Sequence, residues 1–290
     1  MKRKSNVKRF REIYGRRVKE RYWYNGSSKE DVTRISKLMG YSQADIDAVP
    51  EGSNLGLGCG NPIAHAAIQE GERVLDLGSG AGMDCFIAAD KVGITGKVIG
   101  VDMTHAMIHH ARANAEKNNY RNVEFRQGEI EDLPINDGWA DLIISNCTIN
   151  LSPEKKTVFN EAFRTLKPGG RMVIADLVLK KELPDVIKTR FKDLIEGFIA
   201  IIPKAQYLDI INHAGFQDVT VVDETRYSAQ LTDFDDPIVK AAIAELKLSE
   251  KQIKEVAPNA IEVVSITIRA DKPHELAKDS LNHCSGPAGI

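Results

Sequence analysis

Four cysteines, Cys59, Cys85, Cys147 and Cys284, are the side chains of this sequence with the most distinctive chemistry. We read no secretion signal at the N-terminus, and in such a chain reduced thiols are more typical than a disulfide framework. Each thiol is therefore a candidate ligand or nucleophile. Cys59 lies in an uncharged, glycine-rich run, NLGLGCGNP at residues 54–62. Because glycines let a backbone approach other groups closely, this run predicts a loop that places a thiol at a binding site.

A second glycine-rich run, DLGSGAGMD at residues 76–84, follows an apolar stretch that predicts a strand. Gly78, Gly80 and Gly82 allow a tight turn close to a bound cofactor. Asp102 ends the next predicted strand, where an acid accepts hydrogen bonds from a ribose. This arrangement fits a nicotinamide dinucleotide as well as S-adenosylmethionine. The surroundings favour S-adenosylmethionine, since Asp76 is placed to hold a methionine ammonium group.

Two further segments support that preference. GEIEDLP at 128–134 follows the third predicted strand, where an adenine edge would lie, and LKPGG at 166–170 precedes the fifth. Together with the glycine-rich run they resemble the class I S-adenosylmethionine-dependent methyltransferases, although a related fold with an inactive cofactor site stays open. The resemblance implies S-adenosylmethionine as the cofactor. It also implies a cofactor site formed by Asp76, Gly78, Ser79, Gly80, Gly82, Asp102, Met103, Glu129, Ile130, Glu131 and Asn146.

The resemblance narrows to arsenite methyltransferases when more segments are compared. These are EGSNLGLGCGNP, DLGSGAGMDCFIAADKVG, VIGVDMT, GEIEDLP, SNCTINLSPEKKTVFNEAFRTLKPGG and AGF, in this order between about residues 40 and 225. The two most specific segments, LGLGCGNP and SNCTINLSP, contain Cys59 and Cys147. The resemblance implies that these thiolates bind trivalent arsenic as the substrate and that the arsenic lone pair attacks the sulfonium methyl group. Thiolates suit this role because they are soft ligands.

The sequence departs from that family in its other thiols. Phe198 stands where a third arsenic-binding cysteine is expected, and RYWYNGSSKEDV at 21–32 stands where members often carry a cysteine pair. With two thiols, the third arsenic ligand would be a hydroxyl, a methyl group, an external thiol such as glutathione, or Cys284. We therefore expect methylarsenite, which already carries one carbon substituent, or arsenite already bound to glutathione, to be preferred to free arsenite. Cys85, inside the predicted helix after the second run, is expected to be a buried and unreactive core residue.

Two other functions stay open. One is methyl transfer to a carbon, oxygen or nitrogen nucleophile of a quinone or sterol-like molecule, with Phe198, Ile201 and Ile202 forming an apolar pocket. The other is a non-catalytic protein that binds a metalloid through its thiols. The seven histidines show no metal-ligand spacing, so we expect no resident metal.

The elements that must position these residues alternate between strand and helix. Apolar runs predict strands at 73–78, 97–102, 123–127, 140–146, 171–177, 217–222 and 261–270, with helices at 81–91, 105–117, 154–166 and within 184–214. This alternation predicts an α/β fold: a Rossmann-like, doubly wound, mostly parallel seven-stranded sheet with helices on both faces and a small helical C-terminal annex. Ligands of such folds bind at the carboxyl ends of the strands. Cys147, just past the fourth strand, is expected at that edge.

Composition and charge limit the partners. The chain has 290 residues and a net charge of −2, but residues 1–22 hold ten basic and two acidic side chains. An apolar stripe at helical spacing in this segment favours a helix packed on the body over a nucleic-acid-binding arm. No run approaches the roughly 18 apolar residues that a membrane span needs. We expect a cytoplasmic protein with a small-molecule substrate, no nucleic-acid partner and no membrane partner.

The predicted domain division has three parts. A basic helical arm covers 1–50, a class I S-adenosylmethionine-binding methyltransferase domain covers 51–223, and the annex, with the last strand and a tail, covers 224–290.

Overall fold

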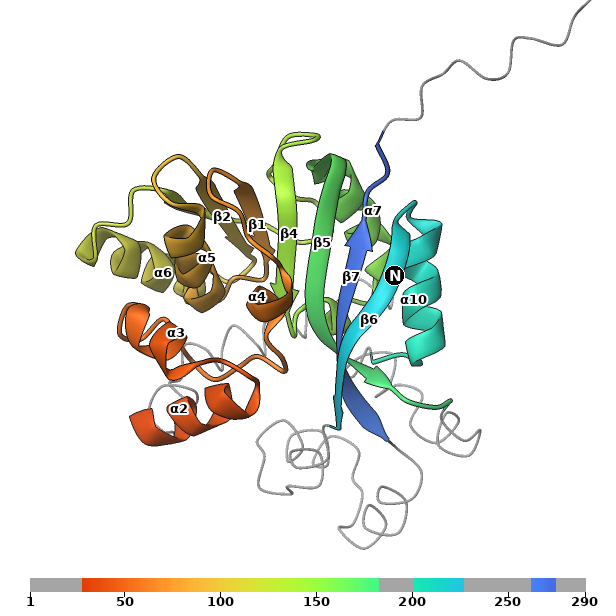
Figure 1. Ribbon diagram of the computed structural model, residues 1–290, viewed down its shortest axis with the longest axis horizontal. Coiled ribbons are helices and arrows are strands. Elements are labelled where there is room, and N and C mark those ends of the chain that lie inside the picture. The colour runs from red at the N-terminus through yellow and green to blue at the C-terminus, as the bar shows by residue number, and fades with distance from the viewer. Residues whose placement is uncertain (1–27, 183–200, 227–261, 275–290) are drawn as a thin grey trace, which may run out of the picture.

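A seven-stranded sheet forms the centre of the molecule (Figure 1). The computed structural model describes residues 28–182, 201–226 and 262–274. In these residues the strand order is β3-β2-β1-β4-β5-β7-β6, with β7 antiparallel to both of its neighbours and the other neighbouring pairs parallel. The strands are β1 Arg73–Leu77, β2 Lys97–Asp102, β3 Val123–Gln127, β4 Ala140–Asn146, β5 Leu166–Leu179, β6 Gln217–Arg226 and β7 Val263–Asp271. The predicted Rossmann-like, mostly parallel sheet is confirmed.

Helices cover both faces of the sheet. Those described are α2 Lys29–Leu38, α3 Gln43–Ala48, α4 Pro62–His65, α5 Met83–Val92, α6 His105–Lys117, the short 3-10 helix η1 Ile149–Leu151, α7 Lys155–Thr165 and α10 Lys204–His213. Buried residues of α4, α5 and α6 pack in one hydrophobic cluster, and those of α7 and α10 pack in another. Figure 1 shows α5 and α6 toward one end of the sheet and α7 and α10 toward the other.

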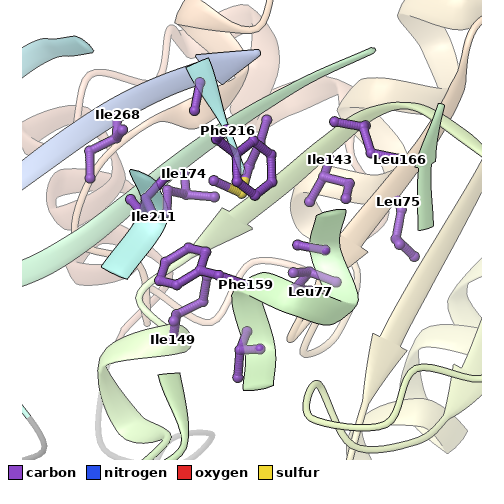
Figure 2. Packing of buried hydrophobic residues seen from close by; sticks show 14 of the residues in the cluster. Leu75, Leu77, Ile143, Ile149, Phe159, Leu166, Ile174, Ile211, Phe216 and Ile268 are labelled. Carbon is purple, nitrogen blue, oxygen red and sulfur yellow. The ribbon is translucent and has the colours of Figure 1, made fainter. Parts of the chain in front are cut away.

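The strand side chains explain why both faces must be covered. Val74 belongs to the cluster with α5 and α6, whereas its neighbour Leu75 belongs to the cluster with α7 and α10. Successive residues of a strand point to opposite faces, so a strand that is apolar at successive positions needs a helix layer on each side. Figure 2 shows the second cluster, where Phe159 of α7 lies near Leu77 of β1 and Ile149 of η1.

The far C-terminal strand belongs to the same sheet. β7 pairs with β5 from Arg171 opposite Asp271 to Leu179 opposite Val263, and with β6 on its other side. The strand that the sequence placed in the annex therefore lies inside the main sheet, between β5 and β6.

Two predicted features fall wholly or partly outside the described residues. The basic segment at the N-terminus does so up to residue 27, and most of the segment from 184 to 214 does so before residue 201. Within the described ranges, no helix is long and apolar enough to cross a membrane.

Candidate functional site

The carboxyl ends of three adjacent strands bring polar side chains together. Asp76 lies near the end of β1, Asp102 ends β2 and Asn146 ends β4. Gly78, in the loop after β1, has a φ of 78°, and a Cβ there would lie 2.2 Å from the Thr148 hydroxyl oxygen. Only glycine fits this position, so the loop after β1 can pack directly against the loop after β4.

Asp102 holds the glycine-rich loop in place. One carboxylate oxygen accepts a hydrogen bond from the Gly80 backbone N–H at 3.0 Å, and the other accepts one from the Thr104 N–H at 2.8 Å. Burial raises the pKa of this carboxyl group, against the effect of those bonds. Gly80 has a φ of 53°, and no heavy atom lies within 4 Å of its absent Cβ. The loop therefore presents bare backbone to an open space.

That open space is a cleft at the carboxyl ends of β1, β2 and β4. Six of the predicted cofactor residues line it together with Cys147: Asp76, Gly78, Ser79, Gly80, Asp102 and Asn146. The other predicted cofactor residues, Gly82, Met103, Glu129, Ile130 and Glu131, do not line it in this structure.

Some of these outlying residues have structural contacts instead. A Cβ at Gly82 would lie 2.6 Å from the Phe125 ring, so this glycine lets α5 begin close to β3. The Glu131 carboxylate accepts a hydrogen bond from the Ser152 hydroxyl at 2.6 Å. Their roles at a cofactor stay predictions.

Two buried carboxyl groups, those of Asp76 and Asp84, line the cleft. Asp76 accepts a weak hydrogen bond from the Cys85 thiol at 3.2 Å, and Asp84 accepts one from the Tyr41 hydroxyl at 2.6 Å. Burial raises the pKa of both groups, that of Asp84 to about 6. The Ser79 hydroxyl in the same cleft is buried and has no hydrogen-bond partner among the described residues. Buried polar groups are normally satisfied, so these groups fit a site that receives a polar, cationic ligand.

Asn146 fastens the loop that carries Cys59. Its side-chain oxygen accepts a hydrogen bond from the Cys59 N–H at 3.0 Å, and its amide nitrogen donates to the Gly60 carbonyl at 2.8 Å and to the Tyr41 hydroxyl at 3.0 Å. A Cβ at Gly58 would lie 2.7 Å from the same amide nitrogen. The glycines of this loop thus allow its backbone to reach the end of β4.

Cys147 is held at a sharp turn directly after β4. Its φ is 57°, which is uncommon for a residue other than glycine, and its N–H donates to the Ala175 carbonyl at 2.8 Å. Such local strain persists only where surrounding structure enforces it. The Cys59 and Cys147 sulfur atoms and one carboxylate oxygen of Asp176 all lie within 4.8 Å of one another. The structure therefore brings together the two thiols that the sequence placed at one edge.

Burial sets the protonation of the first thiol. Cys59 is buried, and this burial, reinforced by the neighbouring Cys147 thiol, raises the pKa of Cys59 well above its ordinary value. Without a bound electrophile, Cys59 is a thiol rather than a thiolate at neutral pH.

Asp176 is a site residue that the sequence analysis missed. Its carboxylate accepts hydrogen bonds from the Tyr207 hydroxyl at 2.6 Å and from the Leu177 N–H at 3.1 Å. Burial raises its pKa to about 6, although the Tyr207 bond and the nearby Lys155 ammonium act in the opposite direction. The available signal was an acid in the middle of the otherwise apolar run RMVIADLVL, since an unpaired charge is rarely buried without a role.

The other two cysteines of the chain are Cys85 and Cys284. Cys85 is fully buried in the cluster with α5 and α6, as predicted for a core residue. Cys284 lies outside the described residues, as does Phe198.

Comparison with known proteins places this chain in a family. A family model described as a methyltransferase domain matches residues 68–279. The arsenite methyltransferase of Halobacterium salinarum is 46% identical over 209 residues, which cover 72% of this chain and 53% of that protein. The arsenite methyltransferase of Mus musculus is 37% identical over 54% of this chain and 44% of that protein. The chain thus spans about half the length of these curated relatives.

Comparison of the fold with solved structures also finds an arsenic methyltransferase. The crystal structure of CrArsM, an arsenic(III) S-adenosylmethionine methyltransferase from Chlamydomonas reinhardtii, superposes with a TM-score of 0.59 at 31% identity, covering 86% of this chain and 76% of that one. The chain therefore belongs to the methyltransferase domain family, and within that family it is related to the arsenite methyltransferases.

Proposed function

We propose that this protein transfers a methyl group from S-adenosylmethionine to trivalent arsenic bound by Cys59 and Cys147. The observation that carries the proposal is the meeting of these two thiols, which lie in separate loops, at the edge of the cleft that the glycine-rich loop lines. Arsenic is the substrate here, and thiolates are the ligands that a soft centre prefers.

The lining of the cleft supports S-adenosylmethionine over a nicotinamide dinucleotide. Asp76 and Asp84 are buried carboxylates, which would repel a pyrophosphate but attract a ligand with an ammonium and a sulfonium group. Asp102, at the end of β2 in this cleft, is proposed to accept hydrogen bonds from ribose hydroxyls, and the Ser79 hydroxyl, which has no partner among the described residues, offers one more polar contact. When bound, the cofactor supplies an electrophilic methyl group.

Thiol ligation would prepare arsenic for methyl transfer. Each thiol that binds loses its proton to a departing arsenic hydroxyl group, which leaves as water, so two sulfur–arsenic bonds replace two arsenic–oxygen bonds. Because burial raises the pKa of Cys59, this residue enters the exchange as a thiol and not as a free buried thiolate. The lone pair stays on arsenic. The loops that carry Cys59 and Cys147 would then hold the arsenic atom in line with the methyl group.

We further propose methylarsenite, or arsenite already bound to glutathione, as the preferred form of the substrate. Two protein thiols satisfy an arsenic atom that already carries a carbon or an external sulfur. Reduced thiols at the site require a reducing compartment, and we therefore propose a cytoplasmic location. The tail thiol Cys284 is expected to contribute little.

We also propose that the methyltransferase domain at 51–223 works with the segments that flank it. Tyr41, from the N-terminal part at 1–50, donates to Asp84 in the cleft, and β7, from the part at 224–290, completes the sheet beside β5. Limited proteolysis with and without cofactor tests this division, which predicts cuts near residues 50 and 224.

Methyl transfer from labelled S-adenosylmethionine tests the main proposal. The purified protein is assayed with arsenite and with methylarsenite, each with and without glutathione. Label is expected in the arsenical product, and Cys59→Ser or Cys147→Ser should reduce it to background. Cys85→Ser is the control for the loss of a thiol at another buried position, because a serine hydroxyl can still donate to Asp76 as the Cys85 thiol does.

Other outcomes would favour the other functions. Label in a quinone substrate but in no arsenical would indicate a methyltransferase for organic molecules; a demethylmenaquinone methyltransferase of Lactococcus lactis is 39% identical over 36% of this chain and 41% of that protein. An arsenical that binds but never receives label would indicate a non-catalytic metalloid-binding protein.

A further inference from the structure

A buried carboxylate lies beside the thiol pair and is not needed to bind arsenic through sulfur. Asp176 is 1% exposed, and one of its oxygens lies within 4.8 Å of both the Cys59 and Cys147 sulfur atoms. An arsenic atom bound to those sulfurs would therefore lie next to this carboxylate.

The donors around Asp176 fit a carboxylate that carries its charge. The Tyr207 hydroxyl and the Leu177 N–H both donate to it, and an ionised carboxylate is an acceptor only. Lys155, also buried, attracts it, while the Lys155 ammonium donates to the carbonyls of Asn150 at 3.1 Å and Ser152 at 2.7 Å. A negative charge is thus kept inside the protein, close to the place where arsenic would bind.

Methyl transfer moves a positive charge toward this place. The bond between the methyl carbon and the sulfonium sulfur breaks, and its electron pair stays on sulfur, which becomes neutral. The arsenic lone pair forms the new arsenic–carbon bond, so arsenic takes the positive charge. No proton, oxidant or reductant takes part in this step.

Three buried carboxylates attract this positive charge at different stages of the reaction. Asp76 and Asp84 line the cofactor cleft, so they attract the cation before the reaction. Asp176 lies with the thiols, so its attraction grows as the charge arrives on arsenic. Only an interaction that is stronger in the transition state than in the ground state accelerates the step.

We propose that Asp176 is a catalytic residue whose carboxylate stabilises the positive charge that develops on thiol-bound arsenic during methyl transfer. This inference rests on the proposed function. It assigns to the thiol site a third group that acts through its charge and is not an arsenic ligand.

Single-turnover methyl transfer to methylarsenite, at saturating cofactor and arsenical, tests the role in the full chain. Asp176→Asn keeps the shape and removes the charge. We expect methylarsenite affinity, measured by equilibrium dialysis, to stay within about threefold, and the transfer rate to fall about 100-fold, as for the loss of one preorganised group aimed at a developing charge. An unchanged transfer rate, or a loss of arsenical affinity as large as the loss of rate, would overturn the proposal.

Asp84→Asn is the matched control. Asp84 is also buried and also accepts a hydrogen bond from a tyrosine hydroxyl at 2.6 Å, but it lies on the cofactor side. This variant is expected to raise the cofactor concentration needed for half-maximal rate and to affect the rate at saturation less than Asp176→Asn does. An equal loss of the saturated rate in both variants would show that any buried carboxylate matters and would overturn the proposal.

A second variant covers the case in which Asp176→Asn does not fold. Asp176→Ser leaves room for a small molecule, and added formate, which brings back a charge, is compared with neutral formamide of similar shape. The proposal requires formate to restore transfer better than formamide; no such difference would overturn it. If the wild-type protein methylates no arsenical, the proposed function itself fails, an outcome distinct from all of these.

Discussion

The hydrogen bonds of Asn146 predict that one amide group controls whether the thiol pair is assembled. In Asn146→Ala, the Cys59 N–H and the Gly60 carbonyl lose partners at 3.0 and 2.8 Å. Each buried polar group left unsatisfied costs about 1–3 kcal/mol, which amounts to about 2–6 kcal/mol if the loop stays closed. The loop is instead expected to open so that water can satisfy these groups.

The lower bound of this free-energy cost sets the smallest loss of methylarsenite affinity that we expect. Since about 1.4 kcal/mol corresponds to a tenfold change in an equilibrium constant, a cost of about 2 kcal/mol predicts that affinity for methylarsenite falls at least about 30-fold. Opening would also expose the buried Cys59 thiol, so its labelling by a thiol reagent should become faster, whereas labelling of Cys85 in the core should not change.

Calorimetry of methylarsenite binding and mass-spectrometric thiol labelling measure the two effects on the same protein. Asn146→Asp is the matched variant: a carboxylate can still accept from the Cys59 N–H, but it cannot donate to the Gly60 carbonyl. We expect its loss of affinity to lie between those of wild type and Asn146→Ala. Wild-type affinity together with unchanged Cys59 labelling in Asn146→Ala would refute the role of Asn146 in holding this loop.

Four other results are expected. Asp102→Ala should weaken cofactor binding in calorimetry, and unchanged affinity would contradict the ribose assignment. Cys85 should resist labelling in the folded wild-type protein; rapid modification would contradict its core position. Phe198→Cys should improve methylation of free arsenite relative to methylarsenite, and a wild-type preference for arsenite that Cys284→Ser abolishes would show instead that the tail supplies the third ligand. Burial raises the pKa of Asp84 from its ordinary 3.8 to about 6, so its contribution to the free energy of unfolding is present below pH 3.8 and is lost as the pH rises through 6; Asp84→Asn should remove that dependence in urea titrations, and an unchanged pH profile would count against the assignment.

The local pattern of the sequence was enough for the fold and for the position of the glycine-rich loop after β1. Apolar runs and glycine-rich turns are local features, so they placed β1, β2, β4 and the loop after β1 within a few residues of where the structure has them. Cys59 and Cys147 were identified because the segments that contain them resemble arsenite methyltransferases. The strand pattern added that Cys147 lies at the edge where parallel strands present their carboxyl ends.

Contacts between distant segments were decided only by the tertiary structure. Asn146 was assigned to the cofactor, but its amide also holds the Cys59 loop, 87 residues earlier in the chain. Tyr207 meets Asp176 across 31 residues, and β7 enters the sheet between β5 and β6. Such partners follow from strand order and helix packing, which leave no periodic signal in the sequence. An acid such as Asp176 therefore reads as an interruption of an apolar strand until the fold places it beside the two thiols.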